Sequence, residues 1–146
     1  MVPTAARTAD GTILVFGDSI SAGYGIKAGE GWAALLQKRL ASQGYGYRVV
    51  NASVSGETTS GGSARLSRAL ELHKPRVLVL ELGANDGLRG LPLDVSRSSL
   101  AAMIESAQAN DAKVLLLGMR IPPNYGPRYA EGFAHMYVEL AKKYKV

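Results

Sequence analysis

Residues 12–21 read TILVFGDSIS, and this stretch decides the fold. Its first five residues are apolar or β-branched and predict a short buried strand, which the glycine, aspartate and serine that follow bring to an end. Three further runs rich in Val, Leu and Ile lie at residues 48–52, 76–82 and 113–118. Such runs are typical of parallel strands that are covered on both faces.

Helix-like stretches separate and follow these runs, because apolar residues recur there at spacings of three and four. The stretches are marked by Trp32, Leu35, Leu36 and Leu40, by Leu66, Ala69, Leu70 and His73, by Leu100, Met103, Ile104 and Ala107, and by Tyr129, Phe133, Met136 or Tyr137, Leu140 and Tyr144. Asp94, after Pro92, is the expected N-cap of the third. Because crossovers between parallel strands are right-handed, this alternation predicts an α/β, three-layer, flavodoxin-like fold with sheet order 2-1-3-4.

Composition limits the class of protein. The 146 residues are 47% hydrophobic and 20% charged, which is typical of a single globular domain spanning residues 1–146. No apolar run approaches the roughly 18 residues of a membrane span, so we expect no stable membrane insertion. The net charge is +5, but the basic residues are scattered except near the end of the chain, which argues against nucleic acid as a partner. The absence of cysteine excludes disulfides and thiol nucleophiles.

The loops that follow the strands are where a parallel sheet binds ligands. Ser19 stands at the top of the first strand, which suits a nucleophile, although serine is also a common helix N-cap. Residues 56–63 nearly spell a phosphate-binding loop, but Gly62 replaces its lysine, so nucleotide binding is disfavoured. In the predicted strand order Ser19, Gly56 and Asn85 converge. One hydroxyl and two N–H donors at one point are the equipment of acyl transfer.

Four segments carry a family resemblance. They read GDSISAGYG at 17–25, NASVSGET at 51–58, LGANDGLRG at 82–90 and RIPPNYG at 120–126. The first three resemble the conserved blocks of the SGNH (GDSL) hydrolases, and the fourth resembles the branch of arylesterases, acyl-thioesterase I and lysophospholipase L1. The resemblance implies a serine esterase or thioesterase that forms an acyl-serine intermediate and needs no metal or other cofactor.

The resemblance also implies roles for single residues. Ser19 would be the nucleophile, and the backbone N–H groups of Ser19 and Gly56 with the Asn85 side chain would form the oxyanion hole. The residues expected to bind the small acyl ester or thioester substrate are Asp18, Leu88, Leu91, Ile121 and Tyr125.

The sequence departs from this family at its C-terminal end. It contains no Asp-x-x-His, which supplies the family's general base and the carboxylate that orients it. His73 and His135 are both expected too far from Ser19 to replace it. We therefore expect a C-terminally truncated domain without its fifth strand, inactive or very weak as it stands. The alternative is a non-catalytic flavodoxin-like module that binds a phosphate, a nucleotide or a lipid.

Two further expectations concern partners and location. Without a fifth strand, the strand at 113–118 would be an exposed apolar edge, which invites a homodimer or a segment swap. The resemblance suggests a periplasmic or secreted full-length protein. However, residues 1–11 lack the apolar core of a signal peptide.

Overall fold

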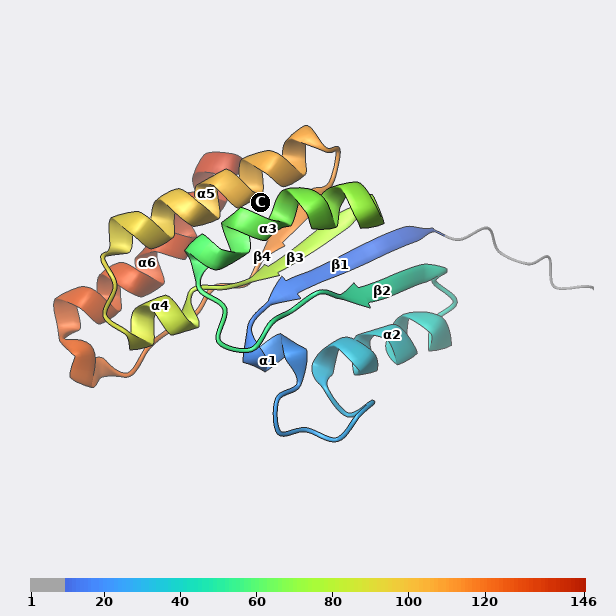
Figure 1. The fold of residues 1–146 in the computed structure, drawn as a ribbon, viewed down its shortest axis with the longest axis horizontal. Coiled ribbons are helices and arrows are strands. Elements are labelled where there is room, and N and C mark those ends of the chain that lie inside the picture. The colour runs from blue at the N-terminus through green and yellow to red at the C-terminus, as the bar shows by residue number, and fades with distance from the viewer. Residues whose placement is uncertain (1–9) are drawn as a thin grey trace, which may run out of the picture.

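The apolar run at the start of the chain forms β1 (Gly11–Gly17), which lies inside a four-stranded sheet. The computed structural model describes residues 10–146, shown in Figure 1. The other strands are β2 (Tyr47–Asn51), β3 (Val77–Glu81) and β4 (Lys113–Leu116). All pairings are parallel, and the order is β2-β1-β3-β4. The predicted strands and their 2-1-3-4 order are confirmed.

Four longer helices cover the sheet unevenly, as Figure 1 shows. In the described residues, α3 (Thr59–His73), α5 (Leu93–Ala109) and α6 (Pro127–Tyr144) cover one face, and α2 (Trp32–Ser42) covers the other. These four match the four periodic stretches of the sequence. Three shorter elements lie in the loops that follow the strands, namely α1 (Ser19–Ala22), α4 (Ala84–Leu88) and the 3₁₀ turn η1 (Pro123–Tyr125). They were not predicted, because one turn of helix leaves no periodicity to detect.

The core has two parts because side chains alternate between the two faces of a strand. Leu14 and Phe16 point to the three-helix face, where they join the larger cluster with residues such as Ile104 and Phe133. The smaller cluster on the α2 face contains Ile13, Val15, Ala33 and Val79.

Two details of the predicted helices are wrong. Leu35 is 51% exposed, whereas Ala33 is only 4% exposed. At about 100° per residue, Ala33 lies on the same side of α2 as Trp32 and Leu40, and Leu35 projects past its edge. The N-cap of α5 is Pro92, so Asp94 lies within the first turn of the helix. There its carboxylate accepts a 2.8 Å hydrogen bond from Arg97.

The expectation that every strand is covered on both faces holds only for the inner strands. Leu115 of the edge strand β4 is 53% exposed, since the single helix α2 packs over the other side of the sheet. β4 is therefore an exposed apolar edge, as expected. Residues 1–9, most of the segment considered for a signal peptide, lie outside the described residues. Among the helices of residues 10–146, none is long and apolar enough to cross a membrane.

We predict that Gly62→Ala destabilises the fold. A Cβ on Gly62, in α3, would come within 2.4 Å of Leu82 Cδ1 and 3.3 Å of Phe16 Cε1. Overpacking of this kind lowers the free energy of unfolding by about 1–3 kcal/mol. Urea denaturation measures the loss, and Ser67→Ala at an exposed position of α3 is the control. An equal stability of both variants would contradict the prediction.

Candidate active site

Ser19 is the first residue of α1, and only Asp18 separates it from the end of β1. The N-cap of this helix is Asp18, whose carboxylate accepts a 3.0 Å hydrogen bond from the Ile20 N–H. Ser19 is therefore not the cap, which removes that alternative. Because the first N–H groups of a helix have no partner within it, the Ser19 N–H is free of α1. Ser19 is half-buried at the carboxyl-end rim of the sheet.

Gly56 lies in the loop between β2 and α3, in a left-handed conformation with φ of 79°. The loop is attached to β1, because the Ala52 N–H donates to Val15 O at 2.8 Å and the Val54 N–H donates to Gly17 O at 3.0 Å. These bonds continue the pairing of the two strands beyond the sheet. Within residues 10–146, the Gly56 N–H donates to no other group, so it is available to a ligand.

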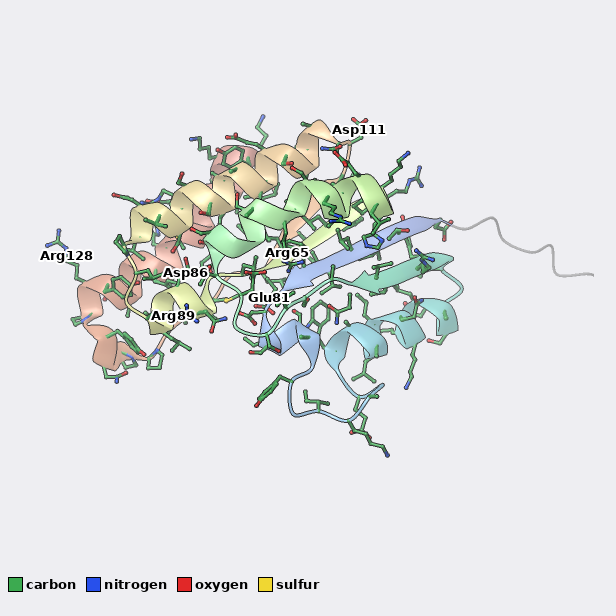
Figure 2. The ribbon with its side chains drawn as sticks, viewed as in Figure 1. Arg65, Glu81, Asp86, Arg89, Asp111 and Arg128 are labelled. Atoms are coloured by element: carbon green, nitrogen blue, oxygen red, sulfur yellow. The ribbon has the colours of Figure 1, made fainter. Side chains whose placement is uncertain are left out.

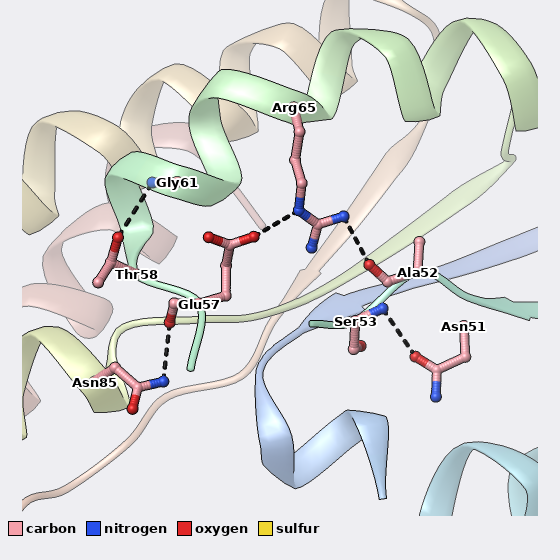
Figure 3. A network of polar contacts seen from close by, with 8 residues as sticks. All are labelled: Asn51, Ala52, Ser53, Glu57, Thr58, Gly61, Arg65 and Asn85. Atoms are coloured by element: carbon pink, nitrogen blue, oxygen red, sulfur yellow. Dashed lines mark hydrogen bonds and ion pairs between the residues drawn. The ribbon is translucent and has the colours of Figure 1, made fainter. Parts of the chain in front are cut away.

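Asn85 lies in α4, which is separated from the end of β3 by two residues, and its side chain reaches the Gly56 loop. Its Nδ2 donates to the backbone oxygen of Glu57 at 2.9 Å, as Figure 3 shows. This amide group carries two hydrogens, so one remains for another acceptor. The structure thus brings Asn85 beside the residue that follows Gly56, and it joins the same loop to Gly17, two residues before Ser19.

Arg65 of α3 holds the two ends of this loop, a role that no sequence pattern indicated. Its Nε lies 2.6 Å from Glu57 Oε2, and its Nη1 donates to Ala52 O at 2.8 Å (Figure 3). The guanidinium also stacks 4.0 Å from the centre of the Phe16 ring. Because residues 52 and 57 bracket Gly56, Arg65 limits the positions that the Gly56 N–H can take.

Asp86 is a second residue whose role sequence reasoning missed. Its buried carboxylate accepts from the Thr59 N–H at 2.8 Å, the Thr59 hydroxyl at 2.6 Å and the Ser96 hydroxyl at 2.9 Å. Asp86 therefore joins the N-terminal ends of α3 and α5 to α4. Figure 2 places Asp86 and Glu81 toward the end of the sheet where the strands finish, whereas Asp111 lies at the opposite end.

The predicted substrate-binding residues occupy different settings. Leu88 is 49% exposed, and its backbone oxygen accepts a 2.8 Å hydrogen bond from the Tyr125 hydroxyl. The oxygen of Leu91 accepts from the Tyr129 hydroxyl at 2.5 Å, so the segments after β3 and β4 lie side by side. Ile121 is almost buried in the larger core. Asp18 is 1% exposed and lies beneath the Ser19 turn as its cap.

A hollow of about 1460 Å³ lies between the end of β4 and α6. Residues 118–121, Pro123 and the part of α6 up to Val138 line it, and Ser19, Gly56 and Asn85 do not. It is therefore separate from the rim that carries the three predicted catalytic groups.

Neither histidine lies in a position to serve Ser19. His73 is the last residue of α3, at the end of the sheet where β3 begins. The His135 side chain is 65% exposed on α6, with its Nε2 3.4 Å from Glu139 Oε1. In the described part of the chain, no cluster of three His, Asp or Glu side chains could hold a metal ion.

Comparison with known proteins gives consistent matches. A family model described as GDSL-like lipase/acylhydrolase matches residues 15–146. Esterase TesA of Pseudomonas aeruginosa is 56% identical over 134 residues, which are 92% of this chain and 67% of the relative. The thioesterase 1/protease 1/lysophospholipase L1 of Escherichia coli is 44% identical over 97% of this chain and 66% of its own length. This chain thus spans about two thirds of the length of these relatives.

A solved structure agrees with the sequence matches. The psychrotrophic esterase EstA from Pseudoalteromonas, solved as inhibited by monoethylphosphonate, superposes with a TM-score of 0.89. It is 41% identical, and the match covers 93% of this chain and 74% of that one.

We predict that Arg65→Met loosens the Gly56 loop. The variant keeps an apolar stem against Phe16 but leaves Glu57 and the Ala52 oxygen without their donor, which lowers the free energy of unfolding by about 1–3 kcal/mol. Hydrogen–deuterium exchange of peptides covering residues 52–58 should become faster. The control is Arg68→Met, at an exposed position of α3. If exchange in Arg65→Met is no faster than in the control, the contacts of Arg65 with Glu57 and Ala52 do not hold the loop.

Proposed function

The chain belongs to the GDSL-like lipase/acylhydrolase family, and on that premise we propose that Ser19 is the nucleophile of a carboxylic ester or thioester hydrolase. The resemblance inferred from the four sequence blocks is confirmed by this membership. The observation that best supports the proposal is the bond from Asn85 to Glu57, because it attaches an amide donor to the residue that follows Gly56, whose N–H is free.

The proposed reaction proceeds through an acyl-serine. Ser19 Oγ attacks the carbonyl carbon and gives up its proton to a base, while the carbonyl oxygen becomes an oxyanion. The Ser19 N–H, the Gly56 N–H and the second Nδ2 hydrogen of Asn85 stabilise this charge. The bond to the alcohol or thiol then breaks, and that group leaves with a proton. Water attacks the acyl-serine in the same way, releasing the acid and restoring the Ser19 hydroxyl.

The base of this reaction is the part that the 146 residues do not supply. The sequence has no Asp-x-x-His, and both histidines stand away from Ser19. We propose that the 146-residue chain on its own retains only the acceleration that an oxyanion hole and binding give, about 10³- to 10⁴-fold over water.

The proposed substrates are small acyl esters or thioesters, as the names of the relatives indicate for those proteins. Leu88, Leu91 and Tyr125 are proposed to contact the acyl group, because their segments meet at the same rim. A periplasmic or secreted location for the full-length protein stays a prediction.

Labelling by a fluorophosphonate tests the nucleophile. We expect slow, stoichiometric modification of the 146-residue chain at Ser19, with very weak turnover of a p-nitrophenyl ester. Ser19→Ala should abolish the labelling, and Ser60→Ala, at an exposed serine of α3, should leave it unchanged. Asn85→Ala should slow labelling by about 10²- to 10³-fold, since one oxyanion donor is lost.

Two outcomes would contradict this proposal. Rapid ester turnover would mean that a base is present among these residues. Absence of labelling, together with a rise in melting temperature on adding a nucleotide, would favour the alternative of a non-catalytic binding module.

We also propose that the exposed edge of β4 pairs with a second copy of the chain. An uncovered apolar edge strand offers free backbone groups to another strand, and Leu115 adds exposed apolar surface there. Light scattering should show a mass that rises with concentration from that of a monomer toward that of a dimer. Leu115→Lys should suppress the rise, whereas Leu72→Lys, at an exposed position of α3, should not. A monomeric mass at high concentration would contradict the proposal.

A further inference from the structure

Two carboxyl groups lie buried beneath the Ser19 turn and play no part in the proposed reaction. Asp18 follows the end of β1 and is 1% exposed, while Glu81 ends β3 and is 4% exposed. Each gives one oxygen to the backbone of α1. Asp18 Oδ1 accepts from the Ile20 N–H at 3.0 Å, and Glu81 Oε1 accepts from the Ser21 N–H at 3.1 Å and the Ser21 hydroxyl at 2.5 Å.

The other oxygen of each group has no donor. Asp18 Oδ2 and Glu81 Oε2 are both buried without a hydrogen-bond partner. No Lys, Arg or His among residues 10–146 forms an ion pair with either carboxylate. Two ionised carboxylates buried without a cation or further donors repel each other and lose their hydration. The Asp18 side chain lies within hydrogen-bonding reach of Glu81, so a single proton between the two free oxygens would satisfy both.

We propose that Asp18 and Glu81 share one proton, with Glu81 Oε2 donating to Asp18 Oδ2, and that this bond positions the Ser19 turn. The bond links the last residue of β3 to the N-cap of α1, so Glu81 and Asp18 together hold the first turn of that short helix. Glu81 is thus a positioning residue rather than a catalytic one. The effect on Ser19 rests on the proposed function, whereas the shared proton does not.

The charges around the pair favour the neutral form of Glu81. Burial raises the pKa of Glu81 from its ordinary 4.5 to about 7, the Ser21 hydroxyl opposes the rise, and the charge of Asp18 adds to it. On α6, the buried Tyr137 hydroxyl donates to Leu82 O at 2.7 Å. Burial raises the pKa of Tyr137, and the charges of Asp86, Glu81 and Asp18 raise it further, so Tyr137 stays neutral.

The direction of the pH effect follows from this pKa. Between pH 4.5 and about 7 the folded chain keeps a proton that the unfolded chain releases. The stability of the fold therefore falls as the pH rises through this window and then levels off. Above it, the charged pair pushes apart the groups that hold α1.

Trp32 reports on the pair without any need for catalysis. It is the only tryptophan of the chain, and its Nε1 donates to the Ser21 hydroxyl at 3.2 Å. That same hydroxyl donates to Glu81, so a change in the charge of Glu81 alters the environment of the indole through the Ser21 hydroxyl. Trp32 fluorescence should change with a midpoint near pH 7.

Glu81→Gln and Asp18→Asn test the proposal in the folded 146-residue chain. The glutamine amide can accept from Ser21 and donate permanently to Asp18, as the protonated acid does. This variant should lose the fluorescence transition and the fall in melting temperature between pH 5 and 7. Asp18→Asn supplies the donor from the other side and should move the transition to lower pH. Glu71→Gln, an exposed glutamate of α3, is the control and should titrate as the unmodified chain does.

A transition near pH 7 that persists unchanged in Glu81→Gln would overturn the proposal, because it would belong to another group. So would the absence of any transition in the unmodified chain between pH 5 and 9. The rate of fluorophosphonate labelling at Ser19 tests the positioning role. It should fall above pH 7 relative to Glu81→Gln, and equal rates at every pH would refute that role. If labelling fails but Trp32 titrates, the proposed function is wrong and the shared proton stands.

Discussion

The hydrogen bond from the Val54 N–H to the Gly17 oxygen is the contact on which the arrangement of the rim depends. It extends the pairing of β1 and β2 past the last residues of both strands, so the loop that carries Gly56 leaves the sheet beside the turn that carries Ser19. Asn85 then attaches the loop after β3 to the same segment through Glu57. Two bonds thus relate three segments that are far apart in the sequence, and the parallel register of the strands sets where each segment starts.

The sheet and the residues placed at its rim could be predicted because they depend on local signals. Short apolar runs indicate the strands. Because crossovers between parallel strands are right-handed, few orders of four strands in a sheet are possible. Once β1, β2 and β3 are neighbours, the segments containing Ser19, Gly56 and Asn85 must follow at the same edge. The match to known family blocks added the roles that the residues alone left open.

The supporting contacts could not be predicted because they join residues across large gaps in sequence. Glu81 bonds to Ser21 and Asp86 bonds to Thr59, and no periodicity links the members of either pair. Arg65 stands on a helix whose spacing predicts only that it is helical. The burial of Ala33 in place of Leu35 depended on where α2 meets the sheet, which the pattern of apolar residues does not determine.

The two tyrosine hydroxyls that donate to the Leu88 and Leu91 oxygens limit how the segments after β3 and β4 can move relative to each other. Both phenols are rigid arms from the segment after β4, and both end on the backbone of the segment after β3. A shift of either segment relative to the other therefore stretches these two hydrogen bonds. The two segments can therefore move apart only when both hydrogen bonds are broken, each at a cost of about 0.5–1.5 kcal/mol.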